Sequence, residues 1–325
     1  MVTVPSVLLA AIILFPLAVV LLPAAAVFDV ARARPRLPTA RVFAFGYSYL
    51  AWELIAITVA AVMWIVSGFG LLLRTRWFQE THRQVQVAWA RSNLRNLDRF
   101  LRMRLEVVGG SRLGPGPVLV LSRHASMIDT LIPIQLADDV GLGCRYVLKD
   151  ELLWDPALDL IGHRFPNYFV DRSGGNTQEA IRAVGELAAG TLPSESFIIF
   201  PEGSRFTEAK RDRAIERLRV SSPDAAERAE KLTATMPPRT GGPIEALSRR
   251  PAGTDVVIVA HTGFEGLAGP KDLWRIAPFG HPIRYELWRI PSEEIPEGRD
   301  ELVAWLYDRW AEVDTWVRDN AEPQR

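Results

Sequence analysis

Residues 117–129 read PVLVLSRHASMID and contain the change of pattern that decides the fold. The first six, PVLVLS, form a short continuous apolar run, as in a strand that is covered on both faces. Similar runs follow, SFIIFP at 196–201 and DVVIVA at 255–260, and helix-like stretches lie between the runs at 128–136 and 177–189. This alternation predicts an α/β domain with a mixed central sheet flanked by helices.

The same stretch places His124 five residues before Asp129. In a regular helix that spacing separates two side chains by about 140°, so the pair would meet only across a bend. Ser126 is well placed to cap a helix that starts at Met127, with Asp129 at the third position of a capping box. A histidine oriented by a carboxylate suits a general base. On spacing alone, an ordinary helix cap beside a loop histidine is the favoured explanation.

Two further stretches could carry chemistry. FPEGSRF at 200–206 follows a strand-like run and forms a tight turn with one carboxylate, Glu202, and one guanidinium, Arg205. Arginine pairs with phosphate, and ligands of open α/β sheets bind beyond the carboxyl ends of strands. YFVDRSGG at 168–175 contains Arg172 and two glycines, and it is either a phosphate loop or a simple turn.

The first part of the chain is apolar. Residues 5–28 carry no charge, and residues 43–73 carry only Glu53; a bilayer core needs roughly 20 such residues in a helix. We therefore predict a membrane-embedded pair of helices over residues 1–75, followed by the α/β domain over residues 76–325. A cleaved signal peptide is disfavoured, because the amino terminus is the only basic group before the apolar run. Glu53 should lie near an interface or face the other helix.

The arginines leave the orientation of this pair open. They lie between the two segments and directly after the second, at Arg32, Arg34, Arg36, Arg41, Arg74 and Arg76. Both groups would favour the cytoplasmic side. A shallow hairpin in one leaflet satisfies that preference, whereas a two-pass anchor is the simpler topology, and the two are about equally supported.

The charge balance points away from nucleic acid. The chain has 38 basic and 38 acidic residues, yet residues 1–104 hold 12 arginines against 4 acidic residues, and eight of those arginines fall between Arg74 and Arg104. A basic segment next to a membrane is attracted to anionic headgroups. The single cysteine, Cys144, rules out an intramolecular disulfide and a cysteine-rich metal site.

Taken in order, HASMID at 124–129 and FPEGSR at 200–205 resemble the two leading motifs of the glycerolipid acyltransferases, the family typified by 1-acylglycerol-3-phosphate acyltransferase. PRTGG at 238–242 is similar to the branch that acts on long-chain lysophospholipids. The resemblance covers roughly residues 107–260.

This resemblance implies a membrane enzyme of phospholipid biosynthesis that transfers a fatty acyl group from acyl-CoA or acyl carrier protein to the free hydroxyl of a lysophospholipid such as lysophosphatidic acid. It implies that His124 is the base and Asp129 its partner. It also implies that the enzyme needs no metal or other cofactor. From the arginines beside the apolar segments, we also expect the catalytic domain on the cytoplasmic face. The acceptor's phosphate would be held by Glu202, Gly203, Ser204, Arg205 and Arg172. The other histidines, His82, His163, His261 and His281, would be structural.

The chain departs from the family pattern at two places that matter here. Arg123 stands where asparagine is usual, and the apolar run 256–259 lacks the usual proline and leads into His261. Two other functions stay open. One is a lipid hydrolase, weakened because no Gly-x-Ser-x-Gly sequence occurs, and the other is a lipid-binding scaffold without activity.

Overall fold

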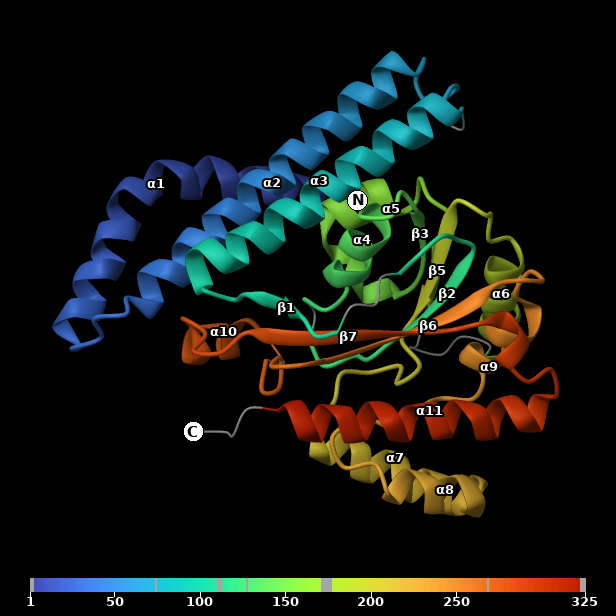
Figure 1. The fold of residues 1–325 in the computed structure, drawn as a ribbon. Helices are drawn as coiled ribbons and strands as arrows, with labels where there is room; N and C mark the ends of the chain where they lie inside the picture. The colour runs from blue at the N-terminus through green and yellow to red at the C-terminus, as the bar shows by residue number, and fades with distance from the viewer. Residues whose placement is uncertain are drawn as a thin grey trace. The chain divides into compact units, whose positions relative to one another are not determined.

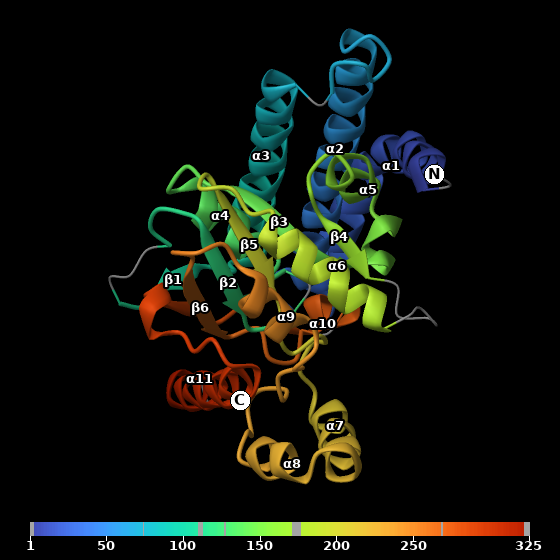
Figure 2. The same ribbon diagram turned by 90° about the vertical axis from the view of Figure 1, so that its right-hand side faces the viewer.

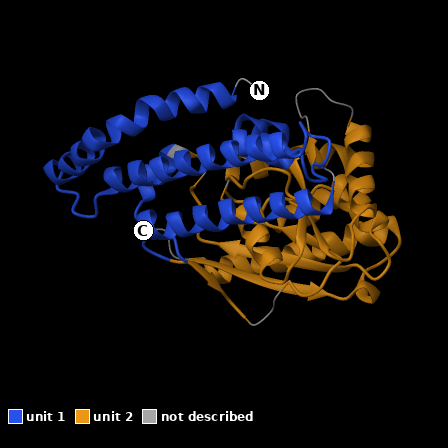
Figure 3. Cartoon of the chain, turned by 90° about the horizontal axis from the view of Figure 1, so that it is seen from above, with its two compact units in different colours: residues 1–104, 149–167, 270–281 blue, residues 105–148, 168–269, 282–325 orange. Residues whose placement is uncertain are grey.

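The protein is described by a computed structural model that covers residues 3–73, 75–109, 113–126, 128–170, 177–267 and 269–321. It divides into two compact units, coloured separately in Figure 3. The first contains Met1–Arg104, Lys149–Asn167 and Pro270–His281, and the second contains Leu105–Leu148, Tyr168–Gly269 and Pro282–Arg325. The first unit therefore extends past residue 75, the domain boundary that hydropathy predicts.

The first unit is helical. Its helices are α1 (Thr3–Ala31), α2 (Pro38–Val66), α3 (Arg76–Leu101), a 3-10 turn at Asp150–Trp154, α5 (Pro156–Gly162) and α10 (Pro270–Ile276). The predicted N-terminal pair of apolar helices is confirmed as α1 and α2, which are long and apolar enough to cross a membrane by length and composition. The second helix ends at Val66, before the end of the apolar run, and turns follow from Ser67 onward.

Glu53 does not face α1, the other apolar helix. Its carboxylate accepts hydrogen bonds from the Trp89 indole of α3 and from the Ala157 backbone amide of α5, both at 3.1 Å. Its side chain is buried within the first unit. The carboxyl group inside the apolar segment is thus hydrogen-bonded to donors of neighbouring helices, as a buried polar group requires.

The second unit is built on a seven-stranded sheet with the order β1-β7-β6-β2-β5-β3-β4 (Figure 1). Pairing is parallel for β1 with β7, β6 with β2, β2 with β5 and β5 with β3, and antiparallel for β6 with β7. The predicted mixed α/β sheet is confirmed. Its strands are β1 (Leu105–Val107), β2 (Val118–Ser122), β3 (Gly143–Lys149), β4 (Tyr168–Val170), β5 (Glu195–Ile199), β6 (Asp255–Thr262) and β7 (Ile283–Ile290).

The three apolar runs predicted to be strands are β2, β5 and β6, the adjacent central strands of the sheet. Every residue of β2 is buried, and so is every residue but the first of β5 and of β6. Because β2 runs parallel to both neighbours, the carboxyl ends of all three strands meet at one edge. Side chains that follow these strands are therefore brought together.

Helices cover both faces of the sheet. α6 (Thr177–Ala189), α9 (Gly242–Arg249) and α11 (Arg299–Asn320) share one core with β2, β5 and β6, and Figure 1 shows α4 (Leu131–Asp138) on the side opposite α11. The charged segment after the second motif forms two helices, α7 (Glu208–Ser221) and α8 (Pro223–Glu230). A separate 3-10 turn at Ser292–Glu294 lies between β7 and α11. Ile215 of α7 and Ala229 of α8 pack against Tyr307 of α11, and Figure 2 shows both helices below α11.

Candidate active site

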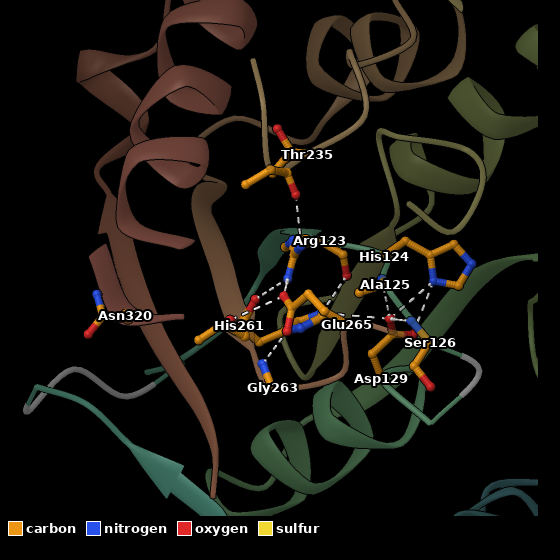
Figure 4. Close-up of polar contacts among 12 residues, drawn as sticks. Arg123, His124, Ala125, Ser126, Asp129, Thr235, His261, Gly263, Glu265 and Asn320 are labelled. Atoms are coloured by element: carbon orange, nitrogen blue, oxygen red, sulfur yellow. Dashed lines mark hydrogen bonds and ion pairs between the residues drawn. The ribbon is translucent and has the colours of Figure 1, made fainter. Parts of the chain in front are cut away.

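His124 and Asp129 lie in the loop that leaves β2, and their side chains meet (Figure 4). The imidazole Nδ1 is 3.1 Å from Oδ1 and 3.3 Å from Oδ2 of Asp129. Asp129 is fully buried, whereas the His124 side chain keeps 13% of its surface exposed. Nε2, the far nitrogen of the ring, faces away from Asp129 (Figure 4). The spacing that cannot form a pair within a helix forms one across the loop.

The carboxylate of Asp129 is held by the backbone of the same loop. Oδ2 accepts hydrogen bonds from the amides of Ala125, at 2.7 Å, and Ser126, at 2.8 Å. Burial alone would raise the pKa of Asp129, but the His124 imidazole and the backbone amides outweigh it and hold that pKa below its usual value. Asp129 is therefore a fixed anion at neutral pH, and it orients the Nδ1–H tautomer of His124.

The predicted helix start at Met127 is wrong, although the Ser126 amide donates to the Asp129 carboxylate at 2.8 Å, as it would in a capping box. α4 starts at Leu131, so Asp129 precedes the helix instead of occupying its third position. Pro133 explains the shift: it lies in the first turn of the observed helix, where no amide donor is needed, whereas a helix from residue 127 would place it in the interior. Ser126 caps nothing in α4, and its hydroxyl accepts a hydrogen bond from the Ile128 amide at 3.2 Å.

The turn that follows β5 packs directly on the His124 loop. Gly203 has a φ of 63°, the left-handed region that glycine tolerates best. Its amide donates to the carbonyl of Phe200 at 3.0 Å, and the Phe206 amide donates to the carbonyl of His124 at 3.1 Å. The rings of Phe200 and His124 are 4.8 Å apart between centroids. The two predicted motifs thus form one site.

Glu202 is buried beneath this turn and binds backbone on both sides. Its Oε1 accepts from the His124 amide at 3.1 Å, and its Oε2 accepts from the Met236 amide at 3.2 Å. Burial raises the pKa of Glu202 to about 8, although both amides and the nearby Arg123 guanidinium act in the opposite direction. With both oxygens engaged by the backbone, Glu202 positions the loop of His124.

Of the other residues predicted to hold the acceptor's phosphate, the structure describes two and leaves one out. Ser204 and Arg205 lie half-buried in the same turn as Gly203. Arg172 lies outside the described residues, so its predicted phosphate contact stays a prediction.

Three residues that sequence reasoning did not assign to the site lie directly behind it (Figure 4). Arg123 is fully buried, and its guanidinium donates to the carboxylate of Glu265 at 2.6 Å and to the carbonyl of His261 at 2.5 Å. A third hydrogen bond, at 2.8 Å, goes to the carbonyl of Ala234. Arg123 thereby joins the end of β2 to the end of β6 and to the loop before α9.

His261 completes this support. Its Nε2 lies 2.9 Å from the carbonyl of Arg123 and 3.6 Å from Oδ2 of Asp129. Burial lowers the pKa of His261 to about 4, although the Asp129 carboxylate acts to raise it. The ring is therefore neutral at physiological pH, and Nε2–H donates to Arg123. The structural role predicted for His261 is consistent with these contacts, and no sequence pattern indicated its position against the carboxylate of Asp129.

The sequence did contain a signal for both residues. Arg123 and His261 mark two of its departures from the family pattern, and each directly follows a predicted strand. Those departures single out the two positions, whereas their contact follows only from the pairing of β2 with β6.

The comparisons with known proteins point to one family. Residues 104–248 match the family model described as Acyltransferase. The chain is 22% identical over 282 residues to the 1-acyl-sn-glycerol-3-phosphate acyltransferase epsilon of Mus musculus, an alignment that covers 82% of this chain and 75% of that protein. It is 25% identical to the delta enzyme of Homo sapiens, covering 64% of this chain and 54% of that protein.

Two further matches extend the set. The chain is 29% identical over 206 residues to the 1-acyl-sn-glycerol-3-phosphate acyltransferase 3 of Arabidopsis thaliana, covering 60% of this chain and 51% of the relative. The chain thus spans about half the length of the human and plant relatives. Among solved structures, the LPA acyltransferase PlsC of Thermotoga maritima matches with a TM-score of 0.46 at 17% identity, over 85% of this chain and 97% of that one.

Proposed function

We propose that this chain transfers a fatty acyl group from an acyl thioester to the free hydroxyl of a lysophospholipid such as lysophosphatidic acid. The match of residues 104–248 to the family model described as Acyltransferase supports this class of reaction. The observation that carries the proposal is the pairing of His124 with the ionised, backbone-held Asp129, 3.1 Å apart. The relatives named above, which are acyltransferases of 1-acyl-sn-glycerol-3-phosphate, support this choice of acceptor.

In the proposed mechanism His124 is the general base. Nε2 takes the proton of the acceptor hydroxyl as its oxygen attacks the thioester carbonyl, and Asp129 stabilises the imidazolium through Nδ1–H. The tetrahedral intermediate then collapses, the carbon–sulfur bond breaks, and the thiolate takes the proton from Nε2. No acyl-enzyme forms. An imidazole base is sufficient for this chemistry, so we propose that the reaction needs no metal or other cofactor.

We assign the acceptor's phosphate to the turn after β5. Arg205 offers a planar pair of donors to phosphate oxygens, and Gly203 allows close approach of the backbone. Ser204 and Arg172 complete the proposed set. Glu202 acts indirectly in this proposal, because both of its oxygens already bind backbone amides.

The substrate is a lipid, and the first unit suits that requirement. Large apolar side chains of α1 are exposed along most of its length, including Ile12, Val19 and Val20. Exposed apolar surface of this extent marks a membrane-binding segment. We propose that α1 and α2 hold the enzyme at the membrane, with the α/β unit on the cytoplasmic face.

The test is acyl transfer by the full-length protein. Palmitoyl-CoA and lysophosphatidic acid are supplied in mixed micelles, thiol release is followed, and the lipid product is identified by mass spectrometry. We expect phosphatidic acid, and we expect His124→Ala to lower kcat by about 10²–10⁴-fold, the usual cost of losing a general base. The melting temperature should stay close to that of the wild type. His163→Ala, which removes a histidine with a side chain 55% exposed, is the matched control and should keep full activity.

Other outcomes separate the alternatives. Thiol release with free fatty acid and no acylated lipid would identify a hydrolase, and silence with every donor and acceptor would identify a scaffold. The structure gives hydrolysis little support at one position: Ser126, the serine next to the catalytic pair, is fully buried with its hydroxyl oxygen bound to the Ile128 amide.

A further inference from the structure

Helix α7 carries two kinds of basic residue. Arg211 pairs with Asp212 at 2.9 Å, and Arg219 pairs with Glu216 at 2.6 Å and with Glu230 at 2.8 Å. These contacts neutralise one part of the helix surface.

The others recur three and then four residues apart, as Lys210, Arg213 and Arg217, and so share one face of the helix. Among the residues that the structure describes, none of these three lies within ion-pair distance of a carboxylate. The Arg213 guanidinium donates only to the Ala209 carbonyl of its own helix, at 2.9 Å.

A fourth cation joins this face from the loop before α9. The side chain of Arg239 lies over the turn of the second motif, since a Cβ at Gly203 would be 2.6 Å from its Nε. Partial burial, and then the neighbouring Arg217 guanidinium, lower the pKa of Arg239. In the described part of the chain, Arg239 likewise has no acidic partner. We call Lys210, Arg213, Arg217 and Arg239 the cationic strip.

The strip begins beside Arg205 and leads away from it. The Lys210 ammonium donates to the carbonyl of Arg205 at 3.3 Å, and partial burial, followed by the charges of Arg205 and Arg213, lowers the pKa of Lys210. From residue 210 to residue 217 the helix rises by about 10 Å. The strip therefore extends along α7 from the turn that we assign to the acceptor's phosphate, with Arg239 over that turn.

Like charges at these spacings destabilise a helix by about 0.2–0.5 kcal/mol per pair. The cationic strip has two such pairs on α7, and the charge of Arg217 also acts unfavourably on Arg239. A bound anion with several closely spaced charges would reverse that repulsion. Three of the four residues are arginines, whose planar donors match phosphate oxygens.

We propose that the cationic strip is a second phosphate-binding subsite, and that it holds the phosphate groups of the acyl donor's carrier. This inference rests on the proposed acyl transfer. The acceptor carries its phosphate and its reacting hydroxyl on one glycerol, so that phosphate must bind close to His124. Arg205 lies in the turn that packs on the His124 loop. Coenzyme A carries its phosphates at the far end of the pantetheine arm, so it requires cations besides those that hold the acceptor's phosphate. The strip supplies them along α7, beside the turn of Arg205.

The kinetic test uses full-length protein and two donors. Palmitoyl-CoA carries all the phosphates, and palmitoyl-pantetheine carries none. We expect the Arg213→Gln/Arg217→Gln double variant to raise the KM for palmitoyl-CoA at least tenfold, with the KM values for palmitoyl-pantetheine and for lysophosphatidic acid unchanged. Arg219→Gln removes a paired arginine of the same helix, and this control should leave every KM close to the wild-type value.

A binding measurement separates this proposal from the proposed function. Calorimetry with free coenzyme A needs no turnover, and we expect at least tenfold weaker binding by the double variant than by Arg219→Gln. Equal binding by both would overturn the subsite even if acyl transfer is confirmed. If the double variant binds coenzyme A more weakly than Arg219→Gln but the wild type transfers no acyl group, the proposed reaction is rejected and the strip remains a coenzyme A site.

Two other results would reassign the strip. A rise in the KM for lysophosphatidic acid alone would give it to the acceptor's headgroup. Loss of binding to vesicles of phosphatidylglycerol, with all KM values in detergent micelles unchanged, would give it to the membrane surface. Either result overturns the proposal.

Discussion

Asp129 orients His124, and the two backbone amides that hold Asp129 come from residues of the same short loop. All the residues of the pair and its backbone support thus lie in one stretch of sequence, yet spacing alone favoured a helix cap, and the resemblance to a family was needed to predict the pair. The groups behind it could not be predicted. Arg123 and Glu265 are 142 residues apart in the chain, so their contact depends on the sheet bringing β2 and β6 side by side. No local pattern encodes that partner.

The role of Arg205 can be separated from that of the cationic strip. Arg205→Lys keeps the positive charge but loses the planar pair of donors. We expect the KM for lysophosphatidic acid to rise several-fold, with a smaller change for palmitoyl-CoA, provided that substrate binding is close to equilibrium. Steady-state kinetics with each substrate varied in turn, beside a melting curve, measure both effects. An unchanged acceptor KM with a lower melting temperature would make Arg205 a structural residue of the turn.

His261 should make stability depend on pH. Its folded pKa of about 4 lies below the value near 6.5 of an unfolded histidine. As the pH falls from about 6.5 to 4, the unfolded chain binds a proton that the folded protein does not, so the folded state loses up to about 3 kcal/mol. Glu202, with a folded pKa of about 8, acts in the opposite direction, because its stabilising effect is lost as the pH rises from about 4.5 to 8.

A single substitution isolates the histidine. His261→Gln keeps an N–H donor for the Arg123 carbonyl but does not titrate, while Glu202 is the same in both proteins. We expect the destabilisation caused by this substitution to be largest near pH 7 and to shrink by about 2–3 kcal/mol near pH 4.5. Denaturant unfolding at several pH values measures it. A cost that is constant across this range would show that His261 titrates alike in the folded and unfolded states.

At the scale of elements, apolar runs were the most informative signal. β2, β5, β6 and the whole of α6 follow from the sequence, because each has one dominant pattern of burial. α4 was misplaced because two local signals compete: Ser126 and Asp129 resemble a capping box, while Pro133 requires a later start. The proline decided the outcome, because an interior proline costs a helix about 3 kcal/mol or more.

Helix α11 reaches the site through one carboxylate. Asp314, which is buried, accepts hydrogen bonds from the backbone amides of Thr233, Ala234 and Thr235 at 2.7–2.9 Å. The carbonyl of Ala234 in turn accepts from Arg123. The helix therefore fixes a loop that holds the buried arginine behind His124.

Removing that carboxylate should be costly. We expect Asp314→Ala to destabilise the protein by about 3 kcal/mol, because backbone amides lose their acceptor in a buried position. Activity should fall as well, since the Arg123 anchor loosens. Asp308→Ala, on the same helix but 67% exposed, is the control and should change stability by less than about 0.5 kcal/mol. Equal melting temperatures for the two variants would contradict the role of Asp314.

For the whole molecule, hydropathy predicts that the chain has a membrane-embedded part but leaves its topology open. The structure of the first unit adds contacts along α2. Arg41 donates to the Phe100 carbonyl of α3 at 2.9 Å, and Arg164 donates to the Ala60 carbonyl at 3.1 Å. These contacts are separated by 19 residues of α2, or about 28 Å, nearly the thickness of a bilayer core of about 30 Å. Arginine side chains thus lie near both ends of a stretch of α2 that is almost long enough to span the membrane.

We therefore expect the α1–α2 pair to lie as a hairpin in one leaflet. A two-pass anchor would carry the guanidinium of Arg164 and the polar helix α3 into hydrocarbon, at a cost of several kcal/mol for each unscreened charge. The test places one cysteine in the exposed loop between the helices, Ala33→Cys, and another on α8, Glu227→Cys, each in a Cys144→Ala background. A membrane-impermeant maleimide is then applied to sealed vesicles of each orientation. For a hairpin, both cysteines react in the same vesicles; labelling of Ala33→Cys and Glu227→Cys from opposite sides would establish two complete crossings, and the contacts along α2 would then have to open in the membrane.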